Sequence, residues 1–68
     1  MAENNVSYEI RVGGRPGATI RSAFPELQVQ ARGRDTVLSG IFADQAALYG
    51  VVARLKALGL ELIEVRRR

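Results

Sequence analysis

The C-terminal third of the chain, residues 44–68, constrains the fold most, because it reads as one amphipathic helix, a stop and a strand. Asp44 can accept a hydrogen bond from the free amides of a first helical turn. The apolar residues after it recur at the spacing of a single helix face: Leu48, Val51, Val52, Leu55 and Leu58. Gly59 can adopt the positive φ that ends a helix, and Leu60 can fold back onto Leu55. We therefore predict a helix after Asp44 that stops at Gly59 and leads into a terminal strand.

Upstream, the pattern predicts three more strands and a short helix. Alternating apolar and polar residues indicate strands over 7–12 and 27–32, and a brief turn leads from the second into a third strand over 36–42, as in a β-hairpin. Residues 18–24 can form a short helix. With a fourth strand over 60–66, the order is β-α-β-β-α-β. This order predicts an α+β, ferredoxin-like sandwich with a four-stranded antiparallel sheet and a very short first helix. If the first helix is only a turn, the fold is a β-meander carrying one helix.

Two glycines lie inside predicted elements. Gly40 interrupts the third strand and indicates a bulge or a close contact. Gly50 lies within the helix, where glycine costs about 1 kcal/mol relative to alanine. It is either a tolerated small residue or a point where another backbone, from the sheet or from a second subunit, approaches closely.

The length of 68 residues indicates one domain over 7–66, with a flexible N-terminus over 1–6 and a basic tail at 67–68. The chain has no cysteine, so we expect no disulfides and a cytoplasmic location. No apolar run is long enough to span a membrane. So small a core usually needs a further stabilising element, and with neither disulfide nor metal we expect a homo-oligomer.

The strand faces support the same expectation. The third and fourth strands carry apolar residues on both faces, whereas a sheet with one helical layer should be polar outside. A partner, a second copy or another protein, would then cover the outer face or pair along an edge. We predict that this interface includes Leu38, Phe42, Gly50, Ile63 and Val65.

The net charge of +3 comes from ten basic residues, nine of them arginine, against seven acidic ones. Three of the arginines are the last three residues, so the excess is mostly a tail. Candidate nucleic-acid contacts are Arg11, Arg32 and Arg34. A solubilising surface is the plainer interpretation, and no aromatic-rich string suggests base stacking. We do not expect a nucleic-acid partner.

The composition also argues against catalysis. The chain has no histidine and no cysteine, which removes the commonest general base, the commonest thiol nucleophile and most transition-metal ligands. Asp35 has a sufficient structural role in the hairpin turn and Asp44 at the helix cap. Glu61 and Glu64 are three apart on a strand and would project to opposite faces. We expect no enzyme activity, no cofactor and no metal.

A glycine-rich turn precedes the short helix. Its amides could hold an anion, with Arg15 assisting. The candidate residues are Gly13, Gly14, Arg15 and Gly17. The turn lacks the lysine and spacing of a P-loop, so an ordinary connection is the competing interpretation.

The segment TVLSGIFADQAALYGVVARLKALGLELIEVRR resembles the ending of many short bacterial proteins that read roughly DQAALxGxxxRLxxLGLxLxxVRR. This resemblance implies a stand-alone domain of similar length, cytoplasmic and without an assigned activity. The predicted topology also resembles ACT-type regulatory domains, which dimerise and bind amino acids near a glycine turn; topology by itself does not give function.

We therefore expect a small non-enzymatic interaction domain that self-associates through a sheet edge or the open sheet face. The alternatives are an ACT-like ligand-binding regulatory module and a weak nucleic-acid binder.

Overall fold

The computed structural model describes residues 5–14 and 18–68 and contains the predicted β-α-β-β-α-β order. The elements are β1 (Val6–Gly13), α1 (Ala18–Ala23), β2 (Gln28–Arg32), β3 (Asp35–Phe42), α2 (Gln45–Ala57) and β4 (Leu62–Arg67). Most of the N-terminus predicted to be flexible lies outside the described residues, although Val6 already belongs to β1.

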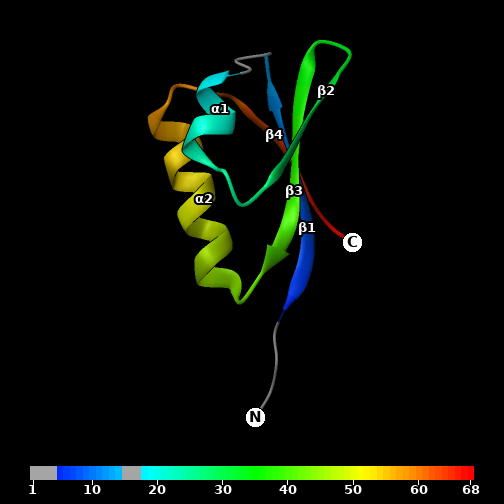
Figure 1. The fold of residues 1–68 in the computed structure, drawn as a ribbon, viewed down its shortest axis with the longest axis vertical. Helices are drawn as coiled ribbons and strands as arrows, with labels where there is room; N and C mark the ends of the chain where they lie inside the picture. The colour runs from blue at the N-terminus through cyan, green and yellow to red at the C-terminus, as the bar shows by residue number, and fades with distance from the viewer. Residues whose placement is uncertain (1–4, 15–17) are drawn as a thin grey trace.

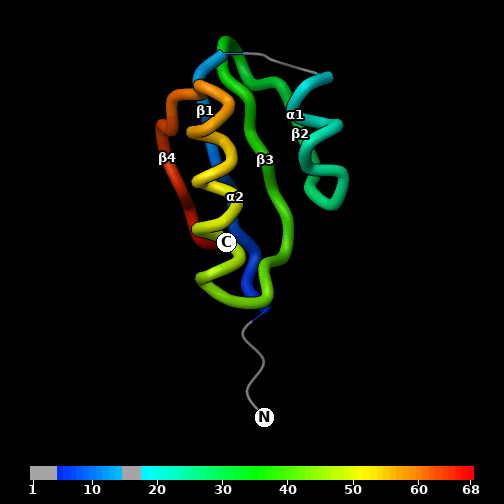
Figure 2. The backbone as a smooth tube through the Cα atoms, turned by 90° about the vertical axis from the view of Figure 1, so that its left-hand side faces the viewer, coloured from blue at the N-terminus to red at the C-terminus, as the bar shows by residue number. Residues whose placement is uncertain are grey.

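The strands form one antiparallel sheet in the order β2-β3-β1-β4, and both helices lie on the same side of it (Figure 1). Seen from the helical side, α2 lies in front of β1 with β4 and β3 on either side of it, and α1 lies by β2 (Figure 2). The predicted ferredoxin-like α+β fold is confirmed, including the short first helix of 6 residues.

Helix α2 begins and ends as its sequence predicts. The Asp44 carboxylate accepts a hydrogen bond from the Ala47 amide at 2.9 Å. At the other end Gly59 has a φ of 82°, its amide donates to the Lys56 carbonyl, and the Leu60 amide donates to the Leu55 carbonyl. These two bonds are the Schellman arrangement, which satisfies carbonyls that a helix end leaves free.

The apolar stripe of α2 forms one half of the core. Leu48, Val51 and Leu55 are buried, and Leu58, which the spacing also placed on the stripe, is 45% exposed because it lies beyond the last turn of the helix. The sheet, α1 and the connection from α1 to β2 supply the other half. This second group of buried residues is Ile10, Val12, Ile20, Phe24, Leu27, Leu38 and Phe42.

Arg54 connects the two helical segments. Its Nη2 donates a hydrogen bond of 2.8 Å to the Ala23 carbonyl at the end of α1, and its guanidinium lies 4.6 Å from the centre of the Phe24 ring. The cation thus both caps α1 and stacks on an aromatic face. This contact helps to keep so short a helix in place, since six residues form few internal hydrogen bonds.

The β2–β3 connection is tighter than predicted. Only Gly33 and Arg34 lie in the turn, because Asp35 is already paired with Arg32 in the ladder. Gly33 has a φ of 59°, a value that glycine tolerates without a Cβ clash.

Gly40 marks a close contact and not a bulge. The β1–β3 register runs without a shift from Val6 to Gly13. A Cβ built on Gly40 would lie 2.5 Å from Leu27 Cδ2, closer than real Cβ contacts. The missing side chain therefore leaves the space that Leu27 occupies.

One glycine within α2 and one just beyond its end predict opposite responses to alanine. Gly50 is mid-helix, and a Cβ there meets nothing within 4 Å, so Gly50→Ala should raise the unfolding free energy by about 0.4–1 kcal/mol. Gly59 has a positive φ, so Gly59→Ala should lower the unfolding free energy by about 1–2 kcal/mol. Urea denaturation of both variants at one protein concentration measures this. Equal effects of the two substitutions would contradict the assignment of Gly59 as the helix stop.

Candidate interaction surfaces

The strand order leaves β2 and β4 as the two edges of the sheet. On β2 the Arg21 guanidinium lies 3.5 Å from the Val29 carbonyl oxygen, so a side chain already covers part of that edge. On β4 the Arg68 amide donates to the Ser7 carbonyl at 2.8 Å. Because paired residues of an antiparallel ladder alternate between bonded and non-bonded, Val65 and Arg67 direct their backbone N–H and C=O groups away from β1.

A bulge in β4 determines which way its side chains face. Arg11 pairs with Glu64 and Val12 with Leu62, so Ile63 has no partner across the ladder. Val65 lies opposite Ile10, a core residue, and Leu62 lies opposite Val12, so Leu62 and Val65 share the helix-covered face. Simple alternation along the strand would put Ile63 and Val65 on one face, but the extra residue shifts the alternation and Val65 does not share the outer face with Ile63.

The other predicted interface residues do not lie on one common surface. Leu38 and Phe42 are 0% and 5% exposed, and both belong to the core beneath α2, so neither can form a surface. Ile63 is 48% exposed and packs over Gly13 on the outer face. Gly50 lies on the exposed side of α2, and no other described part of the chain approaches it.

The outer face of the sheet, on the side away from the helices, is polar. Gln28, Ser39, Glu9 and Arg66 are paired in one row across all four strands. Val37 is 3% exposed on this face although no helix covers it, since it lies between Gln30 and Arg11, whose long side chains can shield it. Ile41 and Ile63 are exposed at opposite ends of the face. They do not form the continuous apolar patch that a face-to-face dimer needs.

A shallow depression of about 530 Å³ lies on this outer face. Its lining comes from all four strands and the last residue: Glu9, Gln28, Gln30, Arg32, Val37, Ser39, Arg66, Arg67 and Arg68. The sequence suggested that the C-terminal arginines form a tail, but the structure shows that they are not free. Arg66 and Arg67 belong to β4, and Arg68 is hydrogen-bonded to β1 through its backbone amide.

The three arginines predicted as nucleic-acid contacts have different surroundings. Arg11 lies on the outer face and forms an ion pair with Asp35, with Nη1 and Oδ2 3.6 Å apart. Arg32 lines the outer depression, and its Nη2 is 3.5 Å from the Gln30 amide oxygen. Arg34 is exposed in the hairpin turn. Sequence reasoning found Arg32 but treated the charge of Arg66, Arg67 and Arg68 as mostly a tail, because nothing in a terminal run of arginines indicates that its end is paired in a sheet.

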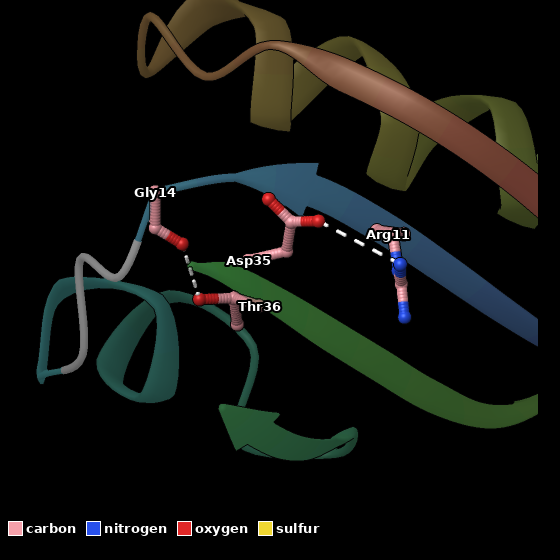
Figure 3. A network of polar contacts seen from close by, with 4 residues as sticks. All are labelled: Arg11, Gly14, Asp35 and Thr36. Atoms are coloured by element: carbon pink, nitrogen blue, oxygen red, sulfur yellow. Dashed lines mark hydrogen bonds and ion pairs between the residues drawn. The ribbon is translucent and has the colours of Figure 1, made fainter. Parts of the chain in front are cut away.

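The glycine-rich turn is a structural connection in its described part. The Gly13 amide donates to the Glu61 carbonyl at 2.8 Å, and the Gly14 amide donates to the Arg34 carbonyl at 3.1 Å. The buried Thr36 hydroxyl donates to the Gly14 carbonyl at 2.7 Å (Figure 3). Neither amide is free for an anion, so Gly13 and Gly14 do not form the predicted site. Arg15 and Gly17 lie outside the described residues.

Two further depressions flank α2. One, of about 540 Å³, lies at the start of the helix and is lined by Val6, Tyr8, Asp44, Gln45, Ala46 and Arg67. The other, of about 320 Å³, lies between α2 and the connection into β2, and Gly50, Ile41 and Leu27 are in its lining. Its lining is mostly apolar, with Glu26 and Arg54 as the charged residues.

Within residues 5–14 and 18–68, no group of three histidine, cysteine, aspartate or glutamate side chains is placed to hold a metal ion. Over the same residues, no helix is long and apolar enough to cross a membrane. Asp44 caps α2, as expected. Asp35 lies in β3, not in the hairpin turn where the sequence placed it, and pairs with Arg11.

Comparison with known proteins gives one match. The family model described as "Domain of unknown function (DUF8691)" matches residues 7–66, which is nearly all of the sheet and both helices. No curated protein and no solved structure matches the chain.

The hydrogen bond from Thr36 to the glycine turn predicts a stability effect. Thr36→Val keeps the shape of the side chain and leaves the Gly14 carbonyl without its donor, so we expect the unfolding free energy to fall by about 1–2 kcal/mol. Thr36→Ser keeps the donor and is the matched control for loss of the bond. Urea denaturation compares them; a valine variant as stable as wild type would show that the bond contributes nothing.

Proposed function

The chain belongs to the DUF8691 family of domains of unknown function, and we propose that it is a small non-enzymatic interaction domain that pairs with a second copy through the free edge of β4. The two sheets would then join across a two-fold axis into one continuous sheet. The charge pattern of β4 is the observation that carries this proposal.

The backbone of β4 is suited to such pairing. Val65 and Arg67 have N–H and C=O groups directed away from β1, and an antiparallel partner strand satisfies groups of this kind. The β4 side chains are all exposed except Leu62, which is half-buried. The bulge at Ile63 confines regular pairing to the residues after it.

Side-chain charge then selects one register. With Val65 opposite its own copy, Glu64 of one chain lies opposite Arg66 of the other, and symmetry makes two such pairs. A shift by one residue in each chain places Glu64 opposite Glu64 or Arg66 opposite Arg66, and like charges directly opposite each other are destabilising. The register centred on Arg66 also brings Glu64 opposite Arg68, but it does so with the two Arg66 residues opposite each other. Of these three registers, the one centred on Val65 pairs opposite charges without any like-charge pair.

The same register places the half-exposed apolar side chains together. Val65 is 38% exposed on the helix-covered face, and its contact with a second Val65 removes apolar surface from water. Charged residues on an edge strand usually discourage pairing. Here both signs occur at positions that complement each other, so they oppose wrong registers and favour one.

Charge reversal tests the register. Each cross-strand pair contributes about 0.2–1 kcal/mol, so Glu64→Arg, which turns two attractions into repulsions, should weaken the dimer roughly ten- to a hundredfold. Arg66→Glu should do the same. The double variant E64R/R66E restores opposite charges across the axis and should recover much of the affinity. Sedimentation velocity over a concentration series gives the dissociation constants.

Two controls separate edge pairing from other effects. Arg32→Glu reverses one charge on the opposite edge and should leave the dissociation constant unchanged. Circular dichroism confirms that each variant is folded, since Glu64 and Arg66 also lie opposite Arg11 and Glu9 within the chain. A wild-type protein that stays monomeric at millimolar concentration, or a double variant as weak as either single one, would contradict the proposal.

A further inference from the structure

The outer depression is lined by an excess of positive charge. Arg32, Arg66, Arg67 and Arg68 contribute four positive charges, and Glu9 contributes one negative charge, so the lining carries a net +3. The chain as a whole also carries +3, with its other charges in balance. Folding therefore gathers these charges around one depression. Arg67 alternates with Arg66 and Arg68 along β4 and also lines the depression at the start of α2.

These arginines are free to bind an external anion. In the described part of the chain, the single ion pair within 4.0 Å joins Arg11 to Asp35, neither of which lines the depression. All four lining arginines are exposed. A guanidinium presents donors in a planar fork that matches a phosphate or carboxylate.

The neutral lining groups add hydrogen-bonding capacity. Gln28 and Gln30 on β2 and Ser39 on β3 each offer donors and acceptors, as contacts to phosphate and sugar require. On one strand, alternate residues such as Gln28, Gln30 and Arg32 are about 6.8 Å apart.

The direction of the depression favours a nucleic acid over an acidic peptide. Its lining runs across all four strands, from Arg32 on one edge to Arg66 on the other. An extended peptide gains most by pairing with a strand along an edge, where its backbone hydrogen bonds are satisfied. A phosphate backbone needs only charge and donors, and can cross the strands.

We propose that the outer face binds single-stranded nucleic acid through its phosphates, without reading sequence. No aromatic side chain lines the depression, so base stacking, which adds affinity in other single-strand binders, is absent from this contact. Binding is then weak and depends strongly on salt. Glu9, in the same row as Arg66, is the one opposing charge.

Fluorescence anisotropy of a labelled oligothymidylate, over a salt series, tests this. Arg32→Gln removes a lining charge away from the β4 edge and should weaken binding several-fold, reducing the slope of log K against log salt by about 0.7. Glu9→Gln should tighten binding. Lys56→Gln, which removes the same charge from exposed α2, is the matched control and should have no effect.

Each outcome decides the proposal. Weaker binding for R32Q, tighter binding for E9Q and no change for K56Q support it, as does equal binding of a labelled oligouridylate. No binding at low salt overturns it, and so does an equal loss in R32Q and K56Q, because net charge would then be the cause. A labelled polyglutamate of matched charge that binds as tightly also overturns the assignment to nucleic acid. None of these variants lies on β4, so the result is independent of edge pairing.

Discussion

The two helices cover the sheet on one side only, and the rest of the structure follows from this constraint. One helix of 13 residues and one of 6 bury a single face, on which Ile10, Val12 and Leu38 lie. The opposite face has no layer over it, so it must be polar to be stable in water. The sheet is also open, and each of its edges is a strand with unpaired backbone groups. No other element of residues 5–14 and 18–68 covers either of the proposed binding surfaces.

The bulge at Ile63 changes the face of the sheet on which the following side chains of β4 lie. Alternation along a strand assigns Leu62 and Val65 to opposite faces, and one extra residue places them on the same one. Val65 thereby moves toward the core and the free edge, while Glu64 and Arg66 lie on the outer face. Apolar residues on both predicted faces of the fourth strand had suggested that a partner covers the outer face. The bulge places Val65 on the helix-covered face instead, so the free edge of β4 is the better place for a second copy.

Much of the fold could be predicted from the sequence, because its signals are local. Asp44 and Gly59 mark the ends of α2, and the alternation over 7–12 marks β1. The residues that form the surfaces were harder to predict. Leu38 and Phe42 were expected at an interface and are core residues, because periodicity shows that two residues share a face but not which face the helices cover. The amides of Gly13 and Gly14, predicted to hold an anion, are instead bonded to Glu61 and Arg34, which are distant in sequence.

By itself, the sequence determined which segments are helix and strand, where α2 starts and stops, and that the chain carries a positive charge. These properties depend on hydrogen bonds and side-chain periods that span a few residues. Only the tertiary structure decided where that charge lies. Pairing of β4 with β1 brings Arg66 and Arg68 onto the same face as Arg32, more than thirty residues away in the chain. Register between strands is a long-range property, set by packing across the whole sheet, and no local pattern in the last three residues encodes it.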